Sequence, residues 1–141
     1  MSSAAAYDLV RQKLIDTVGA TYPVLDWDSL DDTLEQSRTP FLSIADVPTV
    51  EAVVSIGSPA ANWFREDGEI DVHIFSPAVG GFPPARSIAE SVRDALRMQV
   101  LSSEVSILVV NPPEPGIIAD GLWTSMLVGV TFRRHYLAAT A

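Results

Sequence analysis

The sequence contains no cysteine and only two histidines in 141 residues. Without cysteine the chain can form neither a disulfide nor a thiolate metal site, and the redox compartment is left undetermined. No run approaches the roughly 20 consecutive apolar residues of a membrane-spanning helix, so we expect no membrane association. Residues 1–8 lack the basic and apolar regions of a signal peptide, which favours assembly in the cytoplasm.

Basic residues are also scarce: nine Lys and Arg stand against 18 Asp and Glu, giving a net charge of −9. This balance argues against DNA binding by phosphate neutralisation, which needs clustered Lys and Arg. Recognisable catalytic patterns are missing as well, since no serine lies in Gly-x-Ser-x-Gly. A Gly80-Gly81 anion cradle is weakened by Pro83 and Pro84, which lack amide donors. We therefore predict no catalytic residue, no cofactor and no bound metal.

What the chain does have is a core-forming composition and a clear order of elements. Hydrophobic residues make up 48% and charged residues 19%, which suits one domain spanning residues 1–141. Hydrophobic periodicity predicts the two main helices at residues 3–18 and 85–99. The predicted strands lie at residues 39–44 (entered through a proline and placed at a sheet edge), 50–56, 60–66, 69–75, 105–110 and 122–136. This order predicts an α+β fold, a mostly antiparallel sheet with two main helices packed on it.

Residues 63–75 are the most informative stretch. Asp67-Gly68 is a typical hairpin corner, so we expect strands 60–66 and 69–75 to pair across it. Strand alternation places Glu69, Asp71 and His73 on one polar face. Convergent carboxylates and histidines can bind metal, but any half-exposed strand shows this pattern. We predict an exposed polar face, and the alternative function is a small ligand-binding domain or enzyme that uses it.

An acidic segment follows the first helix. It contains Asp26, Asp28, Asp31, Asp32 and Glu35. We interpret it as a solvated loop. A calcium loop is the alternative, but the EF-hand glycine and its terminal glutamate are missing at the expected positions.

The final predicted strand is long, and it carries the only basic cluster, residues 133–136. Its length predicts either a bend near Gly129 or a projection beyond the body of the protein. The basic cluster is either a solvated strand end or an edge that meets the acidic face of a neighbouring copy. The candidate intersubunit contacts are Arg133 and Arg134 in this cluster, and Trp63 and Phe82, aromatic residues that border predicted turns.

Residues 62–97 resemble the middle of the tail terminator proteins of long-tailed phages and related gene transfer agents. The resemblance rests on an aromatic/arginine strand, the Ile-Asp-Val-His-Ile-Phe strand (70–75), the Pro-Ala-x-Gly-Gly loop (77–81) and the Ala-containing helix after it. Downstream, Asn-Pro-Pro-Glu-Pro-Gly (111–116) and Val-Thr-Phe-Arg-Arg-His-Tyr (130–136) also fit. The resemblance is a pattern of apolar strands and turns that covers most of the chain.

This resemblance implies a structural protein that forms a hexameric ring, ends tail tube polymerisation and provides the surface for head attachment. Its partners would be further copies of itself, the tail tube protein and a head-completion protein. DNA would pass through the ring without specific binding, and the acidic residues of segment 26–35 would be candidates for lining the lumen. The implied location is the virion, at the head–tail junction. The closest alternative is a head–tail joining protein one ring higher.

Overall fold

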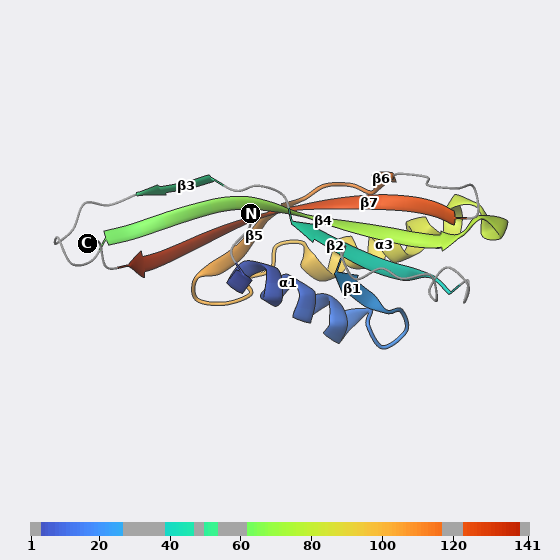
Figure 1. The fold of residues 1–141 in the computed structure, drawn as a ribbon, viewed down its shortest axis with the longest axis horizontal. Helices are drawn as coiled ribbons and strands as arrows, with labels where there is room; N and C mark the ends of the chain where they lie inside the picture. Colours follow the sequence, from blue (N-terminus) through green and yellow to red (C-terminus); the bar gives the residue numbers. More distant parts are fainter. Residues whose placement is uncertain (1–3, 27–38, 47–49, 54–61, 117–122, 139–141) are drawn as a thin grey trace.

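A mostly antiparallel sheet with helices on one face dominates the computed structural model, which describes residues 4–26, 39–46, 50–53, 62–116 and 123–138 (Figure 1). The elements in chain order are α1 (Ala4–Thr17), β1 (Val24–Asp26), β2 (Phe41–Asp46), β3 (Val50–Val53), β4 (Asn62–Pro77), the 3-10 helix η2 (Ala78–Gly80), α3 (Phe82–Leu96), β5 (Val105–Val110), β6 (Glu114–Pro115) and β7 (Trp123–Ala138). The predicted α+β fold is confirmed.

The main path of the sheet has the order β1-β2-β4-β7-β5, and β3 and β6 add to the long strands β4 and β7. The β1–β2 pair is parallel, and the other pairs are antiparallel. The predicted edge position of β2 is wrong, because β2 lies between β1 and β4. Pro40 is compatible with this inner position since it precedes the first residue of β2, Phe41, and removes no donor from the ladder.

The predicted hairpin across Asp67-Gly68 is also wrong. β4 runs without interruption, and it pairs with β7 residue by residue from Asn62↔Ala138 to Pro77↔Trp123. Asp67 lies opposite Arg133 and forms an ion pair with it, which gives the supposed turn residue a place inside the ladder. The long register with β7 therefore overrides the local turn preference of the Asp-Gly pair.

Both helices pack their apolar side on the same face of the sheet. The buried residues of the helices are Ala6, Val10, Leu14, Ala85, Ile88, Ala89, Val92 and Leu96, and Val18, directly after α1, is buried with them. They pack against even-numbered residues of β4, among them Ile70, Val72 and Ile74, and of β7. The predicted helices are confirmed, except that α3 begins at Phe82, three residues before the predicted start at residue 85, and ends at Leu96 instead of residue 99. Proline is compatible with a first helical turn, whose amides have no partner inside the helix.

One end of the sheet projects beyond the helices (Figure 1). We call this projection the arm and define it as residues 62–67 of β4 with residues 133–138 of β7. β3 pairs with β4 along it, from Val50↔Asp67 to Val53↔Phe64. The projection expected from the length of the final strand is thus present.

Candidate functional site

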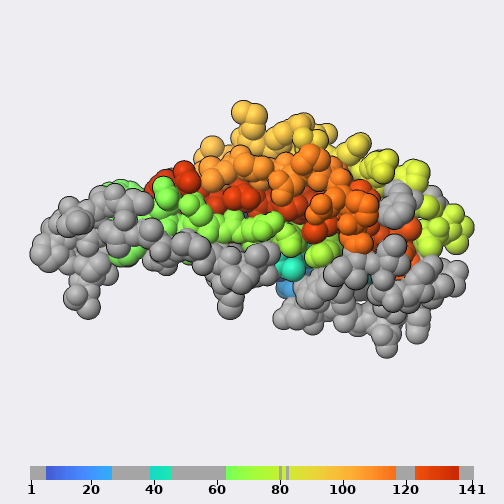
Figure 2. Space-filling view, turned by 90° about the horizontal axis from the view of Figure 1, so that it is seen from above, coloured from blue at the N-terminus to red at the C-terminus, as the bar shows by residue number. Residues whose placement is uncertain are grey.

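The face of the sheet opposite the helices, which we call the outer face, carries the charged residues of the two long strands. Side chains alternate along a strand, so the odd-numbered residues of β4 lie on this face. Their partners on β7 include Thr131 opposite Glu69 and Gly129 opposite Asp71. Seen from this side, β4 (green), β7 (red) and the orange residues of β5 and β6 form the middle of the surface (Figure 2). The candidate site is therefore the extended surface that these strands form.

Three carboxyl groups gather near the middle of the outer face, and we call them the acidic patch: Glu69, Asp71 and Glu114. The carboxyls of Glu69 and Asp71 hydrogen-bond to one another. Gly129 makes room for them, since a Cβ there would lie 2.9 Å from Glu69 Oε1 and 3.7 Å from Asp71 Oδ1. The glycine in the middle of a long strand thus lets two acidic side chains lie over β7.

Burial and mutual repulsion disfavour ionisation of this pair. Burial raises the pKa of Glu69, and the neighbouring Asp71 and Glu114 raise it further. Burial also raises the pKa of Asp71, although the hydrogen bond from Glu69 works in the opposite direction. Within the described part of the chain, no Lys, Arg or His forms an ion pair with these three carboxyls. The acidic patch is a concentration of like charge.

His73 does not join this patch. Its side chain is only 8% exposed, and its ring stacks on Phe75 with a centroid distance of 6.3 Å. Burial lowers the pKa of His73, which favours the neutral imidazole. The predicted exposed polar face is therefore wrong at His73. Among the described residues, no group of three or more His, Cys, Asp or Glu side chains is arranged to hold a metal.

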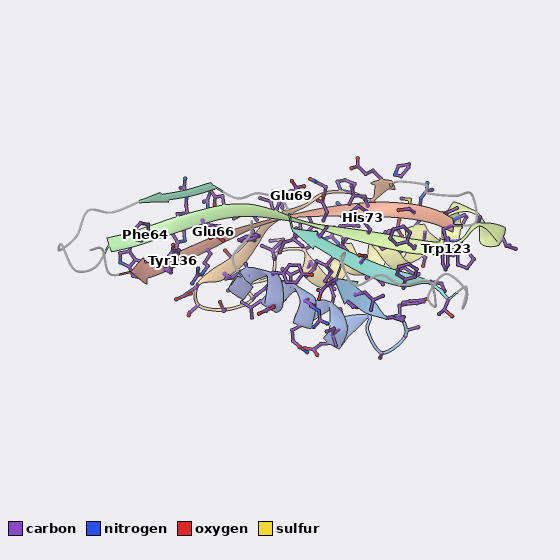
Figure 3. The ribbon with its side chains drawn as sticks, viewed as in Figure 1. Phe64, Glu66, Glu69, His73, Trp123 and Tyr136 are labelled. Carbon is purple, nitrogen blue, oxygen red and sulfur yellow. The ribbon has the colours of Figure 1, made fainter. Side chains whose placement is uncertain are left out.

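An aromatic cluster explains why His73 is buried. Phe41 stacks on Phe75 at 5.0 Å and meets Trp123 edge to face at 5.4 Å. Phe41 and Trp123 are 5% and 7% exposed. His73 and Trp123 lie toward the end of the sheet away from the arm, and Glu69 lies between them and the arm (Figure 3). The apolar surroundings of these rings exclude water from His73.

The outer face of the arm is rich in positive charge. Asp67 accepts a hydrogen bond from Arg133 Nε at 2.7 Å, and Arg65 Nε lies 3.3 Å from the other carboxylate oxygen. The hydrogen bond from Arg133 is the main reason that the pKa of Asp67 is lowered. His135 lies opposite Arg65 in the register and is exposed. The Asp67 carboxylate thus forms ion pairs with two guanidinium groups, and these three side chains together carry a net positive charge.

The other face of the arm, on the helix side of the sheet, is aromatic. Phe64 stacks on Tyr136 at 5.6 Å, and the guanidinium carbon of Arg134 lies 4.1 Å from the centroid of the Tyr136 ring (Figure 3). Arg134 Nε also lies 3.4 Å from Glu104 Oε2. The two arginines that we grouped as one basic cluster therefore belong to opposite faces of the arm.

The remaining candidate residues are placed only in part. Trp63, near the tip of the arm, is 48% exposed, as a surface anchor requires, but it lies inside β4 and borders no Asp-Gly turn. Phe82 is the first residue of α3, and its side chain lies outside the described structure. Asp26 accepts a hydrogen bond from the Tyr7 hydroxyl and pairs with Arg11 at 3.4 Å. The other acidic candidates lie outside the described residues: Asp28, Asp31, Asp32 and Glu35.

The acidic patch was only partly visible in the sequence. Glu69 and Asp71 were placed on one face by alternation, but Glu114 is distant in the chain and reaches them because β6 pairs with β7 at Leu127. The available signal was Gly129, a glycine in the interior of a strand, which often marks close approach of other groups.

Comparison with known proteins places the fold. No family model and no curated protein matches the sequence. A chain in a solved structure of the virion of a native gene transfer agent particle is 20% identical, with a TM-score of 0.50, and the match covers 97% of this chain and 99% of that chain. A second solved structure is 12% identical over 92% of this chain and 96% of that chain, but its TM-score of 0.49 supports no argument. The first match shows a shared fold over nearly the whole length of both chains.

None of the described helices is both long enough and apolar enough to cross a membrane.

Proposed function

We propose that this protein is a structural subunit of a phage-like or gene transfer agent particle, and that it forms the ring that ends polymerisation of the tail tube. The observation that carries the proposal is the full-length likeness to a chain of a gene transfer agent virion. The resemblance of residues 62–97 and 111–136 to tail terminator proteins supports the more specific role. The ring is hexameric in this proposal, and it lies at the head–tail junction of the virion.

The shape of the subunit suits this role. A projecting arm and an extended, charged sheet face offer two separate contact surfaces, which a ring of identical subunits requires (Figures 1 and 2). Once bound to the end of the tube, the ring blocks further tube subunits sterically, so no bond is made or broken. A net charge of −9 on each copy gives the ring a negative lumen that repels DNA and lets it pass.

Removal of the gene tests the proposal. The expected lysate contains full heads beside tails that are overlong or unable to attach, because nothing stops tube growth and nothing presents a surface to the head. Electron microscopy measures tail length and head attachment in the same sample. Normal tails joined to heads would refute the assignment, whereas empty heads would indicate an earlier step in head assembly.

The same experiment separates the head–tail joining alternative. Loss of a joining protein leaves tails of normal length that carry no head, so tail length is the deciding measurement. The enzyme or ligand-binding alternative is disfavoured by the burial of His73, which is 8% exposed and stacks on Phe75.

A further inference from the structure

The arm offers a cationic surface that the described residues of its own subunit neutralise only in part. Arg65 and Arg133 share the single carboxylate of Asp67, and the exposed His135 lies opposite Arg65. Because the arm projects past the helices, neither α1 nor α3 covers this surface (Figure 1).

The acidic patch offers the complementary charge. The described groups beside it include Thr131 and Gly129 from β7 and Asn111 from the segment that leads into β6. His73 follows Asp71 on the same face of β4, where burial lowers its pKa and favours the neutral imidazole. None of these groups is a cation. Like charges held together in this way are unfavourable in an isolated subunit, and a cationic partner would relieve the repulsion.

The arm of a subunit cannot neutralise the patch of the same subunit. Both surfaces lie on the outer face of one unbroken strand pair, and Arg65 and Glu69 are separated along β4 by about 13 Å at the usual rise per residue. Arg133, which lies closer, is held on Asp67 at 2.7 Å. The continuous ladder between β4 and β7 prevents the arm from folding back.

We propose that the outer face of the arm of one copy binds the acidic patch of the next copy, with Arg65 and His135 meeting Glu69, Asp71 and Glu114. The occupant of the patch is a second copy of this chain because the arm carries the opposite charge on a projecting element. Since the two surfaces differ, the contact is head-to-tail, and repeated head-to-tail contacts close into a ring when the rotation between neighbouring copies closes, as the proposed ring requires. This inference rests on the proposed ring and names the surfaces that build it.

The contact is tested by reversing the charge of the arm in one variant and the charge of the acidic patch in another. The arm variant is Arg65→Glu/His135→Glu, which leaves the ion pair between Arg133 and Asp67 in place. The patch variant is Glu69→Lys/Glu114→Lys, which leaves the more enclosed Asp71 unchanged. Each variant alone presents like charges at every contact and should remain monomeric. An equimolar mixture should associate, because each arm then meets a patch of opposite charge.

The measurement is mass by light scattering and native mass spectrometry, with circular dichroism to check the fold. The matched control for the arm variant is Arg86→Glu/Ser87→Glu, which makes the same change of charge, with His135 counted as neutral, at two exposed positions of α3 and should associate like the wild type. Association of the wild type should weaken with added salt, which screens exposed charges over about 10 Å at 0.1 M. If the wild type does not self-associate, or if either variant alone assembles like the wild type, the inference is wrong.

A further variant tests the acidic patch if the charge-reversed patch variant does not fold. Glu69→Gln/Asp71→Asn keeps the shapes of both side chains and removes their repulsion. It should melt at a higher temperature than the wild type at neutral pH, yet associate about tenfold more weakly. A purely structural role of the pair would change melting without changing association. If rings form equally well with these substitutions, the proposed contact is wrong, but the proposed role in tail termination is unaffected. If the contact is verified but deletion of the gene leaves normal tails, the contact stands and the proposed function fails.

Discussion

Arg133 and Arg134 are neighbours in sequence, but they bind carboxylates on opposite faces of the arm. Arg133 donates to Asp67 on the outer face, and Arg134 pairs with Glu104 while its guanidinium lies over Tyr136 on the helix side. Alternation along β7 imposes this separation. A substitution at each position therefore probes a different surface, and a double substitution confounds the two.

We expect Asp67→Asn to lower stability slightly and to change its pH dependence. The pKa of Asp67 is lowered, chiefly by the hydrogen bond from Arg133, so the ion pair contributes stability above the ordinary aspartate value of 3.8. This contribution is lost as the pH falls through the lowered pKa. The effect is small, because both side chains are about one-third exposed.

Thermal melting from neutral to acidic pH measures this effect. The control is Asp94→Asn, which removes the carboxylate of an exposed pair with Arg97 on α3. If the difference between wild type and Asp67→Asn persists unchanged at a pH below the lowered pKa, the assigned origin of the stabilisation is wrong.

The sequence predicted local periodicity well. The apolar faces of α1 and α3 were visible in residues such as Leu14 and Val92, since a helix core pattern repeats over several turns. The alternation of β4 was equally clear. Both features depend on neighbours in the chain.

The errors arose where distant segments decide the structure. Asp67-Gly68 is a turn signal by itself, but β7 offers a partner for every residue of β4, and the ladder continues through it. His73 was predicted to be exposed, and it is buried beside Phe75, which in turn stacks on the remote Phe41. Glu114 joins Glu69 only through strand pairing. None of these partners can be read from the local pattern.

Two glycines should respond differently to alanine. At Gly19, which follows α1, a Cβ would lie 2.6 Å from the backbone oxygen of Ile15, so the backbone itself must move. At Gly129 the nearest atoms, at 2.9 Å, are the ends of the Asn111 and Glu69 side chains, which can rotate away. We expect Gly19→Ala to destabilise by about 1–3 kcal/mol and Gly129→Ala by less than about 1 kcal/mol.

Chemical denaturation of the two variants checks this order. Gly129→Ala should also displace the Glu69 carboxyl from its position beside Asp71, which weakens association if the acidic patch binds a second copy. Equal loss of stability at both positions would show that the space around Gly129 is less adaptable than the side-chain ends suggest.

His73→Phe should reduce the loss of stability on mild acidification. Burial lowers the pKa of His73, so its stabilising effect is fully present above the ordinary histidine value of 6.5. It declines as the pH falls through 6.5 toward the lowered pKa, because the unfolded chain takes up the proton first. Phenylalanine keeps a ring beside Phe75 and removes the titration.

The measurement is the melting temperature of wild type and variant between about pH 7.5 and about pH 5.5. The same substitution at the exposed His135 is the control. If His135→Phe flattens the pH dependence as much as His73→Phe does, burial of His73 is not its cause.

The Glu69–Asp71 pair should produce the opposite pH dependence. Burial raises the pKa of both carboxyls, with the neighbouring charges adding to the effect, so the folded state holds a proton more tightly than the unfolded chain does. The pair destabilises the folded state least at a pH below the raised pKa values, where the carboxyls are protonated. The free energy of unfolding falls as the pH rises through these values. Glu69→Gln/Asp71→Asn should therefore raise the melting temperature at neutral pH, and this advantage should shrink steadily on acidification.

Melting curves of monomeric protein in high salt separate this effect from association, because salt dissociates the proposed contact between copies. A variant that is less stable than the wild type at neutral pH would show that the two carboxyls are held by a favourable contact, and that the like-charge description of the acidic patch is incorrect.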